Sequence, residues 1–178
     1  MPSSDKDVDV DVVVVGAGIA GAAVAWELSA HLTVAVIERE SQAGHHATGR
    51  SASVLNETSG HPIVCALTRA SRPFFENPPA GFCSTPLLSD RGLMWIGRET
   101  DSAALDGCVA QARELGTDVA RLDPDETLGL LPGFRPAAVA GGAVFEPGAR
   151  AIDTAALLNA YLSGAKARGA RVLTSTEA

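Results

Sequence analysis

The sequence has little of what marks several large classes of protein. Only three of its 178 residues are cysteines, Cys65, Cys83 and Cys108, and they lie far apart in the chain. An odd number of scattered thiols is typical of reduced cysteines rather than of a disulfide framework or a metal site. We therefore expect no disulfide, no metal ion and a cytoplasmic location.

Basic clusters and long apolar runs are also missing. Lysine and arginine total 14 against 21 acidic residues, and the formal net charge of −7 disfavours nucleic acid or an anionic membrane as the main partner. No run approaches the roughly 18 apolar residues of a membrane-spanning helix. The opening residues, MPSSDKDVDVD, lack the basic and apolar regions of a signal peptide, and we expect residues 1–8 to form a disordered tail.

The stretch Asp9–Arg39 predicts a strand, a glycine turn, a helix and a second strand. Val10–Val15 is an apolar, β-branched run that suits a strand buried on both faces of a parallel sheet. The motif G-x-G-x-x-G follows at once, with glycines at Gly16, Gly18 and Gly21. Such glycines permit a tight turn, close approach to a pyrophosphate and close packing of helix on strand. We therefore predict a dinucleotide site, with the pyrophosphate at the N-terminus of the helix.

An acidic residue ends the second predicted strand. Glu38 stands 22 positions after Gly16 (38 − 16), where the fingerprint has a carboxylate that binds a ribose hydroxyl. A carboxylate there would repel a 2′-phosphate, which disfavours NADP. The fingerprint alone leaves both FAD and NAD open.

The first helix is expected to run from Ile19 to about His31, with Val24 and Leu28 facing the core and Trp26 off that face. In the FAD form of the fingerprint a glycine usually follows the helix, but Leu32 stands there. A left-handed conformation would cost a residue with a side chain about 1 kcal/mol. We therefore expect that turn to be built differently.

The segment Ser41–Ser53, SQAGHHATGRSAS, is rich in small and polar residues, and its glycines indicate a loop. Thr48 and Ser51 could donate hydrogen bonds to phosphate oxygens, and Arg50 could pair with a diphosphate. A solvated surface loop without a ligand is the alternative interpretation.

Other groups of reactive residues have simpler explanations. The adjacent residues His45 and His46 point apart in most backbones and have no further ligands at metal-binding spacing. The acids of Asp123–Glu126 form a capping box at a helix start. Ser51 is not surrounded by the G-x-S-x-G of a nucleophile elbow. We therefore predict neither a metal site nor a hydrolase.

The remaining chain alternates between helical and strand patterns. Helices are predicted over 62–75, 102–115, a short stretch from Pro124, and 153–168, and strands over 93–97, 139–145 and 171–174. The last strand would return to the sheet begun by the first one, and the rest of a doubly wound layer does not follow. We therefore expect an α/β protein with a Rossmann-like βαβ domain, as the front part of a larger protein.

Three stretches together resemble the FAD-dependent D-amino-acid oxidase superfamily. They are the glycine fingerprint with ATGRSAS at Ala47–Ser53, the segment Ala66–Arg91, and the turn from Glu146 to Asp153. The second of these is most similar to bacterial D-amino-acid dehydrogenases of the D-arginine type. The resemblance implies FAD as the cofactor rather than NAD.

The resemblance also implies roles for particular residues. The residues that would bind FAD are Gly16, Gly18, Ile19, Ala20, Gly21, Glu38, Arg39, Ala47, Thr48, Gly49, Arg50, Ser51 and Ala52. The implied reaction oxidises the C–N bond of a D-amino acid or related amine to an imine and then a 2-oxo acid, by hydride transfer to the flavin. The implied partners are this small substrate and an electron acceptor, and self-association is a further expectation.

The implied organisation has a tail at 1–8, an FAD-binding βαβ with its flavin loop at 9–75, a partial substrate region at 76–148, and a return to the FAD-binding domain at 149–178. The pocket candidates are Val54, Ser59, Leu93 and Trp95. The D-arginine type is similar but has histidine, tyrosine and an acid near the first three, so a neutral or apolar amine is the expected substrate. The alternative, from a different class, is a truncated FAD-binding remnant without catalysis.

Overall fold

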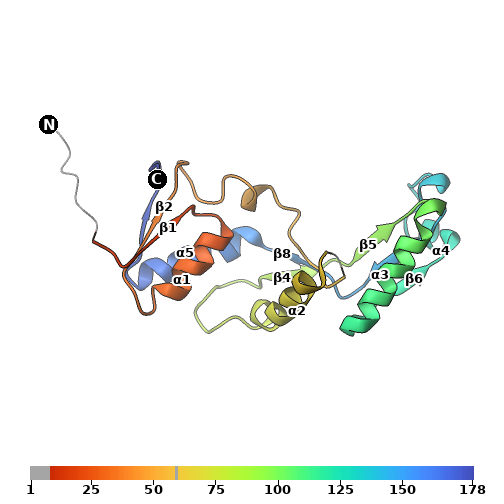
Figure 1. Cartoon of the computed structure of the whole chain (residues 1–178), viewed down its shortest axis with the longest axis horizontal. Coiled ribbons are helices and arrows are strands. Elements are labelled where there is room, and N and C mark those ends of the chain that lie inside the picture. Colours follow the sequence, from red (N-terminus) through yellow and green to blue (C-terminus); the bar gives the residue numbers. More distant parts are fainter. Residues whose placement is uncertain (1–8, 59) are drawn as a thin grey trace. The chain divides into compact units, whose positions relative to one another are not determined.

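The computed structural model describes residues 9–58 and 60–178 (Figure 1). The predicted tail at 1–8 and the pocket candidate Ser59 therefore lie outside the described residues. The chain forms two compact units that alternate along the sequence. The first contains the residues up to Ser53, Pro78–Leu87 and Asp153–Ala178, and the second contains Val54–Asn77 and Leu88–Ile152. The predicted FAD-binding segment at 9–75 therefore spans parts of both units.

The first unit is built on a parallel sheet. It consists of β1 (Val12–Val15), β2 (Val34–Ile37) and β9 (Arg171–Leu173), in the order β1-β2-β9. Val12 is in register with Val34, and Ala35 with Arg171. The α/β class, the βαβ start and the return of the last strand to the same sheet are confirmed.

Two helices cover one face of this sheet. They are α1 (Ile19–Leu28) and α5 (Thr154–Ala167), which pack against each other and lie next to β1 and β2 in Figure 1. The core between helices and sheet is made of small and β-branched residues, with Ala25, Val34, Val36 and Ala165 almost inaccessible to solvent. Asp153 caps α5 by accepting a hydrogen bond from the backbone N–H of Ala156, 2.8 Å away.

The predicted details of α1 were partly wrong. The helix ends at Leu28 rather than near His31, and Val24 is 47% exposed instead of facing the core. Ala22 and Ala25 are buried in its place, because small side chains let α1 approach α5 closely. Among the described residues other than glycine, only Ser53 and Ser175 have positive φ, so the turn after α1 needs no left-handed Leu32.

Trp26 also differs from the prediction, because it packs against the core instead of lying off it. Its ring makes edge-on contacts with Phe82 and Tyr161, with centroid distances of 5.2 and 5.7 Å. A Cβ atom on Gly164 of α5 would lie 2.6 Å from this ring. The absence of a side chain at Gly164 is thus what lets Trp26 lie against α5.

The prediction that the first strand is buried on both faces was wrong as well. In β1, Val13 is 53% exposed and Val15 is 70% exposed, while Val14 packs on the helix side. Within the described part of the chain β1 is an edge strand, and α1 and α5 cover one face of its sheet. The apolar run therefore predicted the strand correctly but not which of its faces is buried.

The described residues of the second unit form two antiparallel sheets. One has the order β3 (Val54–Leu55), β8 (Arg150–Ile152) and β4 (Leu88–Asp90), and the other has the order β5 (Leu93–Ile96), β7 (Ala143–Glu146) and β6 (Ala120–Leu122). Its helices are α2 (Pro62–Glu76), α3 (Ser102–Leu115) and α4 (Pro124–Leu130). Single-turn 3₁₀ helices occur at Thr48–Arg50 in the first unit and at Glu99–Asp101 and Pro136–Ala138 in the second.

The helix predictions in this unit were more accurate than the strand predictions. Helix α3 has the predicted bounds and ends at Gly116, whose φ of 67° is left-handed. Helix α4 begins with the predicted capping box, in which the Asp123 carboxylate accepts from the Glu126 N–H at 2.8 Å. The predicted strand 139–145 is wrong at its start, because β7 begins only at Ala143. Strands β3, β4, β6 and β8, of two or three residues each, were not predicted.

A buried polar cluster joins several elements of the second unit. The Glu146 side chain is fully buried and accepts hydrogen bonds from the Glu57 N–H, at 2.8 Å, and from the Thr58 hydroxyl. The Glu57 carboxylate in turn pairs with Arg72 of α2, with 2.5 Å between Nε and Oε1. Arg72 also donates to the Gly148 carbonyl at 3.1 Å. The cluster therefore fixes the segment after β3 against α2 and β7.

Candidate functional site

The glycine turn between β1 and α1 is compact. Gly16 has a φ of 95°, in the left-handed region that favours glycine. A Cβ atom on Gly21 would lie 2.0 Å from the Gly16 carbonyl oxygen, so α1 rests directly on the turn. Gly18 caps the helix without a side-chain hydrogen bond. The N-terminus of α1 is thus bounded by backbone, which allows an anion to approach its N–H groups closely.

Glu38, directly after β2, closes the other side of this turn. Its carboxylate accepts hydrogen bonds from the backbone N–H of Ala17 at 2.9 Å and of Glu40 at 3.0 Å. The Glu40 N–H, followed by the Ala17 N–H, lowers the pKa of the Glu38 carboxyl below its usual range, so the group is ionised near neutral pH. A carboxylate has about four lone-pair positions, and two of them remain to accept from hydroxyl groups.

The predicted binding loop is docked on the glycine turn. Thr48 accepts a hydrogen bond from the backbone N–H of Ile19 at 3.0 Å, and the Gly44 N–H donates to the Ala17 carbonyl at 3.2 Å. A Cβ atom on Gly49 would lie 2.6 Å from the Gly44 carbonyl oxygen, so the loop is itself tightly folded. Loop, turn and helix start therefore form one continuous surface.

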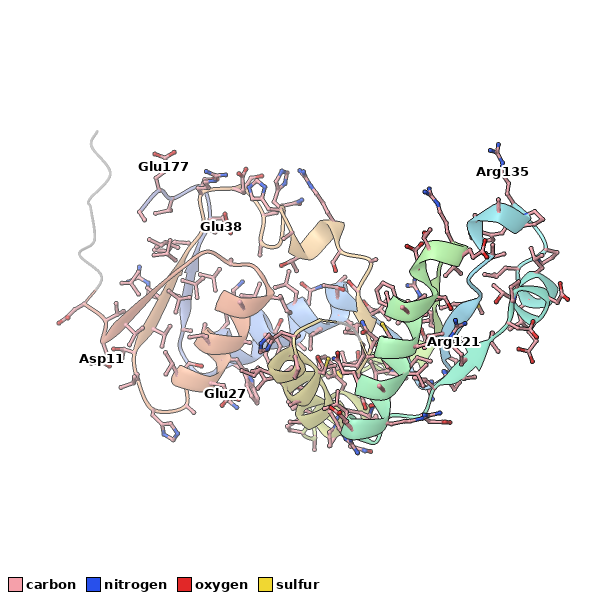
Figure 2. The ribbon with its side chains drawn as sticks, turned by 45° about the vertical axis from the view of Figure 1, so that its right-hand side comes forward. Asp11, Glu27, Glu38, Arg121, Arg135 and Glu177 are labelled. Carbon is pink, nitrogen blue, oxygen red and sulfur yellow. The ribbon has the colours of Figure 1, made fainter. Side chains whose placement is uncertain are left out.

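A cavity of about 480 Å³ lies beside this surface, at the carboxyl ends of the strands. Its lining residues are Val15, Gly16, Ile37, Glu38, Arg39, His46, Thr176, Glu177 and Ala178. Figure 2 shows Glu38 and Glu177 at the end of the sheet opposite to Asp11, which precedes β1. In open α/β sheets, ligands bind outside the carboxyl ends of the strands. The volume lies within the range of about 300–1,000 Å³ that is usual for ligand pockets.

The structure brings together most of the residues that the sequence analysis assigned to the cofactor. Gly16, Gly18, Ile19, Gly21, Glu38, Arg39 and Thr48 all lie at the turn or its cavity. A second cavity of about 360 Å³, lined in part by Thr48, Gly49 and Ser51, lies between the loop and α5. Ala20, Ala47, Arg50 and Ala52 are solvent-exposed.

The substrate-pocket candidates among the described residues lie on two different sheets. Val54 lies on β3, in register with Ala151 of β8. Leu93 and Trp95 lie on β5 of the other sheet, and Trp95 is in register with Val144, which packs under α3. Trp95 is 39% exposed.

Sequence reasoning missed the C-terminal residues of the cavity, Thr176–Ala178, and missed His46. The histidine was weighed only as a metal ligand, and among the described residues no group of three or more potential ligands could hold a metal ion. The available signal was its place in the loop after the acidic end of β2. None of the helices in residues 9–58 and 60–178 combines the length and the apolar character of a membrane-spanning segment.

Comparison with known proteins identifies the family. Residues 11–178 match the family model described as DAO, FAD dependent oxidoreductase. The chain belongs to this family. FAD is the family's cofactor, and the ionised Glu38, the helix start at Gly18 and the docked Thr48 loop are all suited to a dinucleotide.

Solved structures of several oxidases and dehydrogenases are similar to nearly the whole chain. Glycine oxidase from Geobacillus kaustophilus is 26% identical, with a TM-score of 0.79 over 94% of this chain and 47% of its own. L-α-glycerophosphate oxidase from Mycoplasma pneumoniae, solved with FAD bound, is 20% identical, with a TM-score of 0.80 over 94% of this chain and 45% of its own. L-proline dehydrogenase from P. horikoshii is 21% identical, with a TM-score of 0.74 over 93% of this chain and 44% of its own. The chain spans less than half the length of these proteins.

Proposed function

We propose that this chain forms the FAD-binding part of an oxidoreductase that oxidises the C–N bond of an amino acid or related amine. The observation that carries the proposal is the shared surface of the glycine turn, Glu38 and Thr48, which places an ionised carboxylate next to a helix N-terminus. These are the two groups that a ribose and a diphosphate require.

Each residue of the surface has a specific task in this proposal. Glu38 accepts from the ribose hydroxyls of the adenosine, and Arg39 lies along the adenine edge of the cavity. The α1 N-terminus and the hydroxyl of Thr48 donate to the diphosphate, with Arg50 and Ser51 continuing along the loop toward the flavin. When bound, FAD supplies the acceptor for the hydride that leaves the substrate carbon, and the protein orients the two.

The proposed substrate is a neutral or apolar amino acid rather than D-arginine. A pocket for a guanidinium needs an acid to pair with it, because a buried unpaired charge is costly. Leu93 stands where an acid is expected in the D-arginine type, and Val54 stands where a histidine is expected. The D configuration, the electron acceptor, self-association and the cytoplasmic location stay predictions.

Flavin binding by the purified chain tests the first part of the proposal. We expect the 178-residue protein to bind added FAD and to show the flavin absorbance band near roughly 450 nm. Gly21→Ala should abolish this binding, because the new Cβ would meet the Gly16 carbonyl at 2.0 Å. Gly107→Ala is the matched control, since a Cβ there meets no atom within 4 Å. If wild type and Gly21→Ala both remain colourless, the proposal is wrong.

A panel of D-amino acids tests the second part. The flavin-loaded protein is mixed anaerobically with each amino acid, and the flavin band is followed, with an artificial electron acceptor in parallel. Bleaching by neutral D-amino acids but not by D-arginine is the expected result. Bleaching by D-arginine alone would contradict the substrate assignment.

A second candidate function is FAD binding without catalysis by the chain on its own. The observation that favours it is that the chain spans 43–47% of several similar structures. The same experiment separates the two candidates. Yellow protein that no member of the panel bleaches would favour binding alone, and bleaching would exclude it.

A further inference from the structure

Three charged or titratable side chains meet at the rim of the 480 Å³ cavity. The His46 Nε2 atom lies 2.8 Å from Glu40 Oε1 and 3.3 Å from Arg39 Nη2. Arg39 Nε also lies 3.2 Å from the same Glu40 oxygen. Glu40 thus connects a residue at the end of β2 with a residue of the binding loop.

The chemistry of these groups determines where a proton lies. A carboxylate only accepts hydrogen bonds and a guanidinium only donates them. Since Nε2 is closer to Glu40 than to Arg39, it carries a hydrogen and donates it to Glu40, and it does not accept from Arg39. Glu40 therefore fixes the tautomer and the direction of the ring through Nε2, and this contact leaves Nδ1 for others.

His46 lines the cavity, and its neighbour His45 does not. The two rings are in edge-on contact, with their centroids 5.0 Å apart. The other charged residues at this place are Glu38, Arg39 and Glu177, which also line the cavity, and Glu40. None of these neighbours is aromatic, so the imidazole is the aromatic surface of the cavity lining against which a planar ring can stack.

The geometry points to His46 as an adenine-contacting residue of the dinucleotide site, held in position by Glu40. The purine would lie in the cavity against the imidazole of His46, with the guanidinium of Arg39 beside that ring at 3.3 Å; both groups stack on aromatic rings. This inference rests on the proposed FAD site. It adds to that site a residue that the glycine fingerprint does not contain.

Binding of ADP and FAD to the full 178-residue chain tests the inference by titration calorimetry. His46→Ala should weaken both affinities by roughly fivefold or more, as expected for a lost base-stacking contact. His45→Ala, the matched control in the same loop, should stay within about twofold because it removes no cavity wall. Glu40→Gln should weaken ADP binding less than His46→Ala, because it loosens the ring without removing it.

The wild-type protein provides a second measurement, for which variants serve only to assign the histidine resonances. The chain has four histidines, whose ring resonances can be assigned by single His→Gln variants. Addition of ADP should shift the His46 resonances more than those of His31 and His61. Equal ADP affinities for wild type and His46→Ala, together with His46 resonances that ADP does not shift in the wild type, would overturn this inference and leave the FAD site intact. Wild type that binds neither ADP nor FAD would overturn both.

Discussion

The hydroxyl oxygen of Thr48 accepts a hydrogen bond from the backbone N–H of Ile19, at 3.0 Å and 29 positions away in the sequence. This bond occupies the first N–H of α1 and joins the loop to the helix start. Because the hydroxyl uses a lone pair to accept, its own hydrogen remains to be donated. The Ile19 N–H is therefore used by Thr48, and the Thr48 hydroxyl can donate to a ligand in its place.

Replacing Thr48 tests whether its hydroxyl donates to the cofactor. Thr48→Ala should weaken FAD binding by roughly fivefold to tenfold, since a typical hydrogen bond contributes about 1 kcal/mol. Thr48→Ser retains the hydroxyl and should stay close to wild type, and Thr48→Val should resemble alanine. The measurement is quenching of flavin fluorescence on titration. Equal affinities for the serine and valine variants would show that the hydroxyl has no role.

The pKa of Glu38 predicts a pH dependence of stability. Backbone hydrogen bonds from Glu40 and Ala17 hold this pKa below its ordinary value, so the carboxylate stabilises the fold above an ordinary pKa of about 4.3. That stabilisation is lost as the pH falls through the lower pKa of the folded state. Thermal unfolding from pH 7 to 3 should therefore show a wild-type advantage over Glu38→Gln that is constant above about pH 5 and shrinks below it. The control Glu114→Gln, at an exposed position of α3, should show no such advantage.

Tyr161 predicts a loss of stability as the pH rises, the opposite direction to Glu38. Burial, followed by the negative charge of Glu27, raises the pKa of this phenol. Its contribution to stability is present below the ordinary pKa of about 10 and is lost as the pH rises through the folded value. Tyr161 is the one tyrosine in the sequence, so tyrosinate absorbance reports it alone.

The titration midpoint of the folded protein should lie above that of the protein in urea. Glu27→Gln should lower the folded midpoint only part of the way, because burial remains the larger cause. A folded midpoint equal to the unfolded one would contradict this placement of the ring.

Glu146 tests the polar cluster of the second unit. Glu146→Gln replaces one acceptor oxygen with an NH₂ group that faces the Glu57 N–H or the Thr58 hydroxyl. Leaving a buried donor unsatisfied costs about 1–3 kcal/mol, and we expect the free energy of unfolding in urea to fall by that amount. The exposed residue Glu99 provides the control Glu99→Gln, which should change it by less than about 0.5 kcal/mol. An unchanged free energy of unfolding in Glu146→Gln would mean that the cluster adds nothing to stability.

Local patterns in the sequence predicted those features that depend on neighbouring residues. The glycine turn at Gly16–Gly21, the capping box at Asp123 and the end of α3 at Gly116 are each determined within a few positions. The periodicity of α1 predicted a helix but the wrong face. Which face of α1 is buried depends on α5, more than a hundred residues later, and on the space above Gly164.

In the site too, some features depend on neighbouring residues and others on residues far apart in the sequence. The positions of Glu38 and the glycines follow from a fingerprint, whereas the contact between His46 and Glu40 exists only because the loop folds back toward β2. Strands of two or three residues, such as β3 and β8, carry too few side chains for an alternating pattern. Their positions are determined by pairing across the chain, Val54 with Ala151, which a local pattern does not contain.

The alternation of the two units along the chain has a consequence for folding. The sheet that carries the site pairs β2 with β9, so Ala35 must find Arg171 across the whole second unit. Closing a loop of that length costs entropy before any contact compensates for it, and such non-local pairings form slowly. During synthesis, residues 88–152 can assemble while β9 is still being made. The three-stranded sheet that carries the site cannot be complete before β9 pairs with β2, so slow assembly of the second unit would delay the cofactor site even where no cofactor contact is altered.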